Sequence, residues 1–245
     1  MNKYLKKEIT GANMDSAKWL HKVRTGLLIT LLLIGTLGLL SEKKLPDAKK
    51  TVIWKLENPA LVGGFKPEIL GSPQIVRDNT GIALSFDGID DGLIVPVNPV
   101  AGWKKFTVEV LFKPAADGPT APRFVHFQDD EGNRGTIETR VTPQGQWYLD
   151  TFLRNGKTEK GLTLIDSTHL HPCGQWYWAA LVYDGTKMTH YVNGIKELEG
   201  QIELGPMRAG QISLGVRLNQ VNWFKGLIRE IRFHSVALKS KALQR

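Results

Sequence analysis

Alternation of apolar and polar residues in short runs is the feature that most restricts the fold of this chain. In KFTVEVLFKP (105–114), alternate positions give one face four large apolar side chains: Phe106, Val108, Val110 and Phe112. This period of two is that of a β-strand, whose successive side chains point to opposite faces. Similar runs recur toward the C-terminus, in RFVHFQ, TIETRV, QWYLDTFLR, QWYWAALVYDG, THYVNG, GQISLGVR and LIREIRFH.

Turn residues separate these runs. PQGQ, RNGK, YDGT and VNGI each contain glycine, in most cases after Asn or Asp, and these residues accept the positive φ of tight hairpins. No segment of residues 51–245 has the 3.6-residue period of a helix. The sequence therefore predicts an all-β fold, a two-sheet antiparallel sandwich of about a dozen short strands.

An apolar stretch without charged residues, TGLLITLLLIGTLGLLS, occupies residues 25–41. At about 1.5 Å per residue, a helix of this length would measure roughly 25 Å, close to the thickness of a bilayer core. Trp19 and the basic residues Lys18, Lys22 and Arg24 precede it and suit a headgroup interface. A cleaved signal peptide is the alternative, but its apolar stretch is usually shorter and ends at a small-x-small site, which we do not find. We predict one N-terminal transmembrane helix.

This anchor divides the chain into four parts. Residues 1–24 form a basic N-terminal segment, residues 25–41 the anchor, residues 42–51 a charged linker, and residues 52–245 the β domain. More basic residues precede the anchor than follow it directly, which predicts a cytoplasmic N-terminus. We therefore expect a single-pass protein of the cell membrane, with its β domain in the periplasm or outside the cell.

The distribution of charge argues against a nucleic acid partner, and the cysteine content excludes an internal disulfide bond. The net charge is +8, but most of the surplus lies in residues 1–50, so the β domain is almost neutral. We therefore expect no nucleic acid partner. Cys173 is the only cysteine, which excludes an internal disulfide bond.

Four segments together resemble a known family. ALSFDGIDDGLIVP, FTVEVLFKP, QWYWAALVYDGTKMTHYVNG and GLIREIRFHSVALKSKAL occur in the order found in laminin-G-like domains of the concanavalin A-like lectin/glucanase superfamily. The resemblance covers nearly all of residues 51–245. It implies a jelly roll of two curved sheets with a concave face on which ligands often lie. It does not imply one function, because the family includes glycan binders, protein-binding modules and enzymes.

The first of these segments contains three acids, Asp87, Asp90 and Asp91. The resemblance implies a calcium site at the rim of the sandwich, and calcium takes six to eight oxygen ligands in flexible geometry. The other interpretation needs no ion, because Asp-Gly pairs are typical of a tight bend between strands. We favour the bend and retain calcium as the candidate cofactor.

Catalytic patterns of the family are not matched. Its glucanases carry their acids as E-x-D-x-x-E on one strand, and no such triplet occurs. In RGTIETR, Arg134, Glu138 and Arg140 do not have the R-x-E-x-R spacing of jelly-roll lyases, and His126 precedes this strand. We expect Arg140 to keep Glu138 ionised, as an ion-pair partner or nucleophile but not as a general acid. The prediction is a non-catalytic module, with a glycoside hydrolase or polysaccharide lyase acting on the concave face as the alternative.

Candidate ligand-binding residues lie on neighbouring predicted strands. Glu138, Arg140, Asp150 and Arg154 are the candidates for a polar ligand patch on an open sheet face. We favour the other interpretation, in which they form a lattice of cross-strand salt bridges. Trp223 lies in a predicted loop, where its ring can stack on a sugar or contact a partner. The sequence thus predicts an accessory module that binds a glycan or docks on protein partners of a membrane complex.

Overall fold

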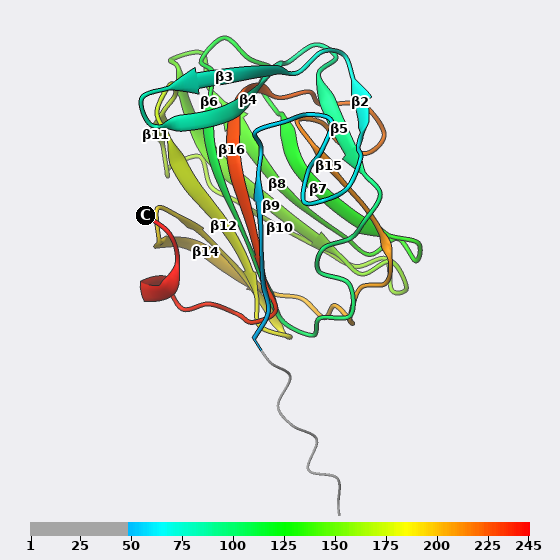
Figure 1. The fold of residues 1–245 in the computed structure, drawn as a ribbon. Coiled ribbons are helices and arrows are strands. Elements are labelled where there is room, and N and C mark those ends of the chain that lie inside the picture. The colour runs from blue at the N-terminus through cyan, green and yellow to red at the C-terminus, as the bar shows by residue number, and fades with distance from the viewer. Residues whose placement is uncertain (1–48) are drawn as a thin grey trace, which may run out of the picture. The chain divides into compact units, whose positions relative to one another are not determined.

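Two antiparallel sheets pack face to face in the computed structural model, which describes residues 49–245 (Figure 1). Sheet I has the strand order β14-β13-β12-β6-β16-β4-β3, with β1 paired to β16. Sheet II has the order β10-β9-β8-β7-β15-β5-β2, with β11 paired to β9. The predicted all-β, two-sheet sandwich is confirmed for these residues.

The strands are short, and most connections are tight. In sheet I they are β1 (Thr51–Lys55), β3 (Gln74–Asp78), β4 (Gly81–Asp87), β6 (Phe106–Pro114), β12 (Tyr177–Tyr183), β13 (Lys187–Val192), β14 (Ile195–Gln201) and β16 (Lys225–His234). In sheet II they are β2 (Glu68–Leu70), β5 (Gly92–Val95), β7 (Arg123–Asp129), β8 (Arg134–Val141), β9 (Gln146–Arg154), β10 (Gly161–Ile165), β11 (His171–Pro172) and β15 (Gly210–Leu214).

Helical structure within residues 49–245 is limited to one 3-10 turn, η1 (Ser240–Ala242). None of the helical structure in this range is long and apolar enough to cross a membrane. The predicted anchor over residues 25–41 and its interface residues Trp19, Lys18, Lys22 and Arg24 lie outside the described residues. The anchor therefore stays a prediction.

The core lies between the two sheets and is rich in aromatic rings. The alternate residues of β6 that were predicted to share a face, Phe106, Val108, Val110 and Phe112, are all at most 1% exposed. The Phe112 ring stacks on that of Phe124 from β7, with ring centroids 4.6 Å apart, and so joins sheet I to sheet II. The strand periodicity of the sequence thus identifies the core face correctly.

The first half of the opposite face of β6 is not open to solvent, because the C-terminal segment covers it. The Thr107 hydroxyl donates a hydrogen bond to the Val236 carbonyl (2.9 Å), and the backbone N–H of Gln244 donates to Oε1 of Glu109 (2.7 Å). Thr107 and Glu109 are consequently buried. At this place the outer face of sheet I is occupied by the chain itself.

The predicted turns lie between strands, but they use glycine for different reasons. In VNGI, Asn193 and Gly194 both have positive φ, 49° and 74°, as expected for a tight hairpin between β13 and β14. In RNGK, Gly156 allows close packing instead, since a Cβ atom there would lie 2.0 Å from the carbonyl oxygen of Glu131.

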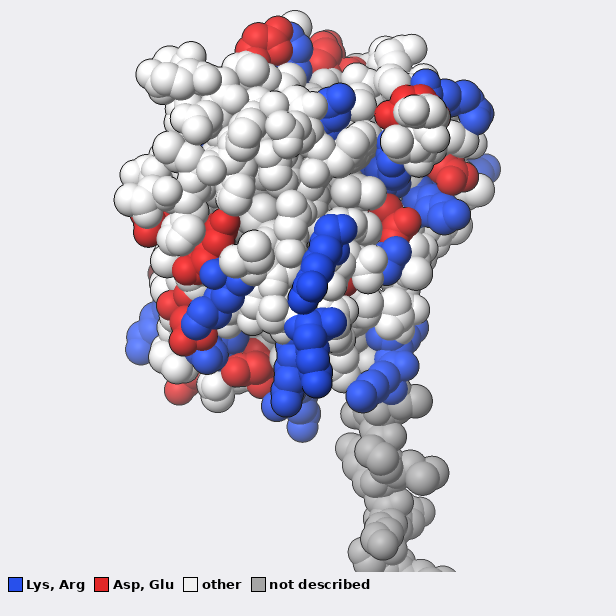
Figure 2. All heavy atoms as spheres, turned by 90° about the vertical axis from the view of Figure 1, so that its left-hand side faces the viewer, with Lys and Arg blue, Asp and Glu red and all other residues white. Residues whose placement is uncertain are grey.

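One side face of the sandwich is shown in Figure 2, turned by 90° from Figure 1. Basic and acidic side chains both occur on its lower half, along its top edge and at its upper right, and its upper left is largely uncharged.

Candidate functional site

A polar pocket with a volume of about 220 Å³ lies on the outer face of sheet II, over β7 to β10. We call it the arginine pocket, because four of its lining residues are arginines. Its lining residues are Arg123, Arg134, Thr136, Glu138, Arg140, Asp150, Phe152, Thr163 and Arg217. Three predicted ligand-binding residues, Glu138, Arg140 and Asp150, therefore come together in one pocket.

Strand register brings the lining residues together. Glu138 of β8 lies opposite Arg123 of β7 on one side and Asp150 of β9 on the other. Thr136 lies opposite Phe152, which in turn lies opposite Thr163 of β10. Residues directly opposite each other share a sheet face, so the period of two along each strand aligns these side chains in the same direction.

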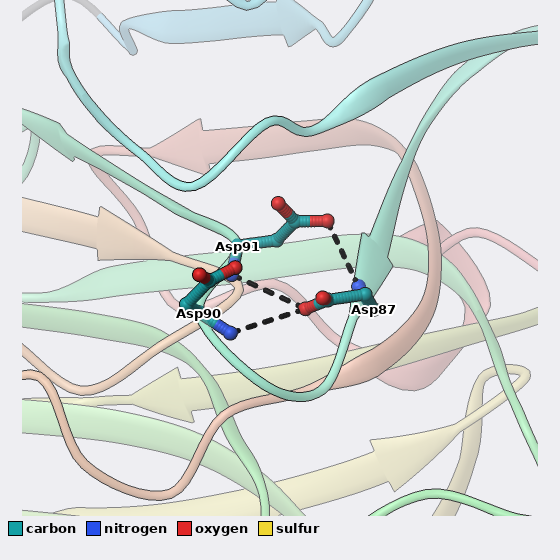
Figure 3. A group of neighbouring side chains, drawn as sticks. All are labelled: Asp87, Asp90 and Asp91. Atoms are coloured by element: carbon teal, nitrogen blue, oxygen red, sulfur yellow. Dashed lines mark hydrogen bonds between the residues drawn. The ribbon is translucent and has the colours of Figure 1, made fainter.

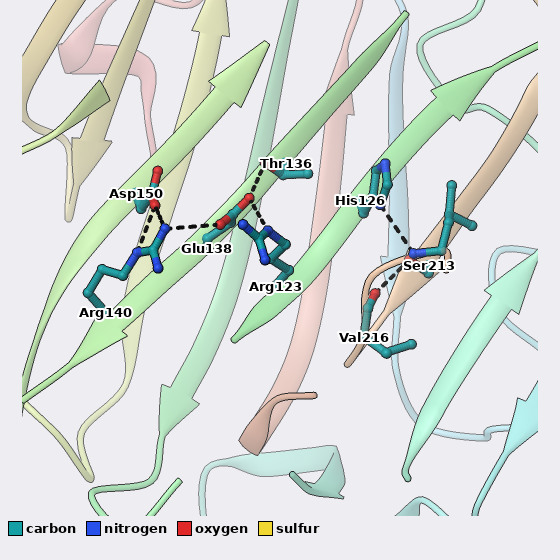
Figure 4. A network of polar contacts seen from close by, with 9 residues as sticks. Arg123, His126, Thr136, Glu138, Arg140, Asp150, Ser213 and Val216 are labelled. Atoms are coloured by element: carbon teal, nitrogen blue, oxygen red, sulfur yellow. Dashed lines mark hydrogen bonds and ion pairs between the residues drawn. The ribbon is translucent and has the colours of Figure 1, made fainter. Parts of the chain in front are cut away.

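Ion pairs connect the two acids to two of the arginines (Figure 4). Oε1 of Glu138 lies 2.8 Å from Nε of Arg123 and accepts a hydrogen bond of 2.6 Å from the Thr136 hydroxyl. Nε and Nη2 of Arg140 both donate to Oδ2 of Asp150, at 2.8 and 2.5 Å. Arg140 also reaches Oε2 of Glu138 at 3.8 Å. The predicted lattice of salt bridges exists, but it lines a pocket and its acids are buried.

The pKa of Glu138 shifts in the direction opposite to the one that a neighbouring arginine alone would produce. We predicted that the neighbouring Arg140 would keep the carboxyl ionised. Burial instead raises the pKa of Glu138, and the nearby Asp150 charge raises it further. Hydrogen bonding by Thr136 and the charge of Arg123 oppose this shift without cancelling it.

His126 lies on the same face, directly opposite Thr136. Burial, followed by the charges of Arg217 and Arg134, lowers its pKa from 6.5 to about 3. Its Nδ1 accepts a hydrogen bond from the backbone N–H of Leu218 (3.1 Å), so the neutral ring carries its proton on Nε2. Nε2 is buried and has no hydrogen-bond partner among the described residues.

Two predicted ligand-binding residues lie outside the pocket. Arg154 is opposite Arg134 in the register of β8 and β9, and it pairs with the exposed Glu159 at 3.2 Å. Trp223 lies in the loop between β15 and β16, and its ring packs near Gly92, where a Cβ atom would be 3.3 Å from Cζ3 of Trp223. The Trp223 ring therefore lies near the start of β5.

Several lining residues were not predicted from the sequence. Arg123 and Thr136 follow from the alternation of β7 and β8 once the strand register is known. Phe152 and Thr163 likewise occupy outward positions on β9 and β10. Arg217 lies in a loop distant in sequence, and no local pattern signals its approach to the pocket.

Two of the three acids of the DGIDDG segment, Asp87 and Asp91, stabilise the bend that connects β4 in sheet I to β5 in sheet II (Figure 3). Oδ1 of Asp87 accepts hydrogen bonds from the backbone N–H groups of Ile89, Asp90 and Asp91, at 2.8 to 3.2 Å. Asp91 accepts from the N–H groups of Asp87 and Ser72. The predicted bend is confirmed.

Calcium at this bend stays a prediction. One carboxylate oxygen from each acid lies within 4.8 Å of the others, a spacing compatible with a shared ion when each ligand is about 2.3–2.6 Å from it. The side chain of Asp90 makes no hydrogen bond among the described residues, so it is the acid that the bend itself uses least.

Comparison with known proteins identifies the class. The chain belongs to the concanavalin A-like lectin/glucanase superfamily, because a laminin-G-type family described by that name matches residues 87–244. The resemblance inferred from the sequence is thus confirmed. No curated protein sequence matches the chain.

Solved structures share the fold at low identity. Domain 4 of AbnA, a GH43 extracellular arabinanase of Geobacillus stearothermophilus solved in complex with arabinotriose, has a TM-score of 0.57 and 20% identity, over 79% of this chain and 96% of that domain. The binding domain of botulinum neurotoxin serotype D has a TM-score of 0.55 and 15% identity, over 78% of this chain. This chain covers only 49% of that toxin domain. At these identities the similarity shows the fold alone.

Proposed function

We propose that the β domain is a non-catalytic module that binds a saccharide in the arginine pocket. The observation that carries this proposal is the pocket itself, with guanidinium, hydroxyl and carboxylate groups converging on about 220 Å³ of the outer face of sheet II. Guanidinium groups donate hydrogen bonds, carboxylates accept them, and hydroxyls do both, so together they match the donors and acceptors of a sugar ring. The arabinotriose complex of the AbnA domain agrees with saccharide binding on this fold.

We propose further that residues 25–41 hold this module on the outer side of the cell membrane, where it meets extracellular or periplasmic glycans. The apolar length of the segment and its basic and aromatic flanks support this part of the proposal. A module of this kind would act as an accessory protein that keeps a polysaccharide, or a glycan-bearing partner of a membrane complex, close to the bilayer.

Catalysis is the second candidate, and one observation favours it. Glu138 and Asp150 lie directly opposite each other on the pocket floor, and two carboxylates are what glycoside hydrolysis requires. The raised pKa of Glu138 would suit a general acid. Against catalysis, Arg123 and Arg140 each bind one of these carboxylates, so the acids serve to hold the arginines in place.

A glycan array probed with the full chain in mild detergent tests saccharide binding. We expect binding to a limited set of glycans, lost in the variant Arg140→Gln and kept in the matched control Arg77→Gln. Arg77 is exposed on β3 of sheet I and distant from the pocket in the strand order. Absence of binding to every glycan class would overturn the proposal. Release of new reducing ends or unsaturated products from a bound glycan, lost in Glu138→Gln, would establish the enzyme instead.

A further inference from the structure

The arginine pocket holds more positive charge than its acids compensate. Four arginines face two carboxylates, and each carboxylate is already paired, Glu138 with Arg123 and Asp150 with Arg140. Arg134 and Arg217 have no ion-pair partner within residues 49–245. The pocket therefore keeps a surplus of at least two positive charges.

This surplus of positive charge lowers the pKa values of neighbouring basic groups. Burial lowers the pKa of Arg134, and the charges of Arg217, Arg154 and Arg123 lower it further, so the guanidinium groups repel each other. The same arginines contribute to the low pKa of His126. A bound anion would relieve this repulsion, because charge-assisted hydrogen bonds to a carboxylate or sulfate are the strong kind that arginine forms.

Unsatisfied polar atoms show what else a ligand must offer. Oδ1 of Asp150 is buried and accepts no hydrogen bond within the described residues, while Oδ2 holds Arg140. Asp150 is only 2% exposed, and it lines the pocket. A buried carboxylate oxygen without a donor costs free energy, so a ligand hydroxyl placed there would be stabilised. Chloride and sulfate ions have no such hydroxyl, whereas a sugar has several.

We propose that the arginine pocket selects an acidic saccharide, with the carboxylate or sulfate of one sugar residue bound between Arg134 and Arg217 and a hydroxyl of that residue donated to Asp150. The inference rests on the proposed function and narrows its ligand class. The volume of about 220 Å³ is below the roughly 300–1,000 Å³ typical of a drug-sized site, so the pocket holds one charged residue of a longer chain.

Calorimetry with matched oligosaccharides tests this inference on the full chain in mild detergent. One ligand is a short oligouronate, the second is the same oligomer with its carboxylates reduced to alcohols, and the third is a sulfated neutral oligosaccharide. We expect at least one of the two charged ligands to bind about tenfold or more tightly than the reduced oligomer, and its affinity to fall as salt is added. The ligand that binds identifies the anion as uronate or sulfate.

Substitutions of the two unpaired arginines test whether the anion binds in the arginine pocket. Arg217→Gln is in a loop and should preserve the fold, and Arg134→Gln removes the other free guanidinium. Each should weaken binding of the charged ligand about tenfold, while Arg134→Lys keeps part of the affinity and Arg77→Gln keeps all of it. Melting curves verify that each variant is folded.

Failure of the inference is distinguishable from failure of the proposed function. Equal affinity for charged and reduced oligomers would overturn the acidic ligand and leave saccharide binding intact. An equal loss in Arg77→Gln and Arg217→Gln would show an effect of overall charge and overturn the pocket assignment. Absence of binding to all three ligands, together with a negative glycan array, would overturn both proposals.

Discussion

The ion pair between Arg140 and Asp150 gives the sharpest stability prediction. In the variant Arg140→Gln, the carboxylate of Asp150 loses its bidentate donor and stays buried, at 2% exposed, with neither oxygen charge-paired. Removing one partner of a buried pair costs about 3–5 kcal/mol. The Arg140 side chain is 29% exposed, so water can reach the remaining carboxylate in part, and we expect a loss of about 2–3 kcal/mol.

Thermal unfolding followed by circular dichroism measures this loss. For a domain of this size, 1 kcal/mol shifts Tm by about 2–4 °C, so Arg140→Gln should lower Tm by about 4–12 °C. The double variant Arg140→Gln with Asp150→Asn removes the stranded charge and should recover part of the difference. Arg77→Gln, on an exposed edge strand, is the control and should leave Tm unchanged. A drop of less than about 2 °C, or a double variant no more stable than the single one, would refute the reasoning.

Three further predictions concern other parts of the chain. Burial lowers the pKa of His126 and of His190 to about 3, so their ring signals should not titrate between about pH 5 and 8 by NMR. Because each pKa is 6.5 without this burial, the free energy of unfolding should fall as pH drops from about 6.5 toward 3. A ring signal that titrates with an inflection near pH 6.5 would contradict the burial. Calcium should raise Tm for the native chain but not for Asp90→Asn, which leaves the bend intact; equal melting with calcium and with chelator would exclude the ion. The full chain should stay with membranes after an alkaline carbonate wash, and a chain lacking residues 1–48 should be released; retention of the shortened chain would refute the anchor.

Strand alternation made much of the fold predictable. The core face of β6 and the shared face of Glu138 and Arg140 follow from a period of two along each strand, which needs no knowledge of neighbours. The register between strands and the covering of β6 by the C-terminal segment could not be predicted, because both depend on contacts between distant segments. The approach of Asp150 to Glu138 is a matter of register, and the burial of Glu109 depends on the C-terminal segment.

The upward pKa shift of Glu138 has the same origin. Its neighbour Arg140 on the same strand is visible in the sequence and favours ionisation. The burial of the carboxyl and the charge of Asp150 act in the opposite direction, and both arise only when β7, β8 and β9 are assembled. Local sequence therefore identified three of the residues that gather at the site, Glu138, Arg140 and Asp150, but not the electrostatic balance among them.

Arginine side-chain NMR during titration with an acidic oligosaccharide tests the central claim most directly, because each Nε–Hε group reports on its own surroundings. The account predicts that the signals of Arg134, Arg217, Arg123 and Arg140 shift in a saturable way, whereas those of Arg77 and of Arg229, which pairs with Asp78 in sheet I, do not. Shifts confined to arginines outside the pocket, or no saturable shift with any saccharide, would contradict it.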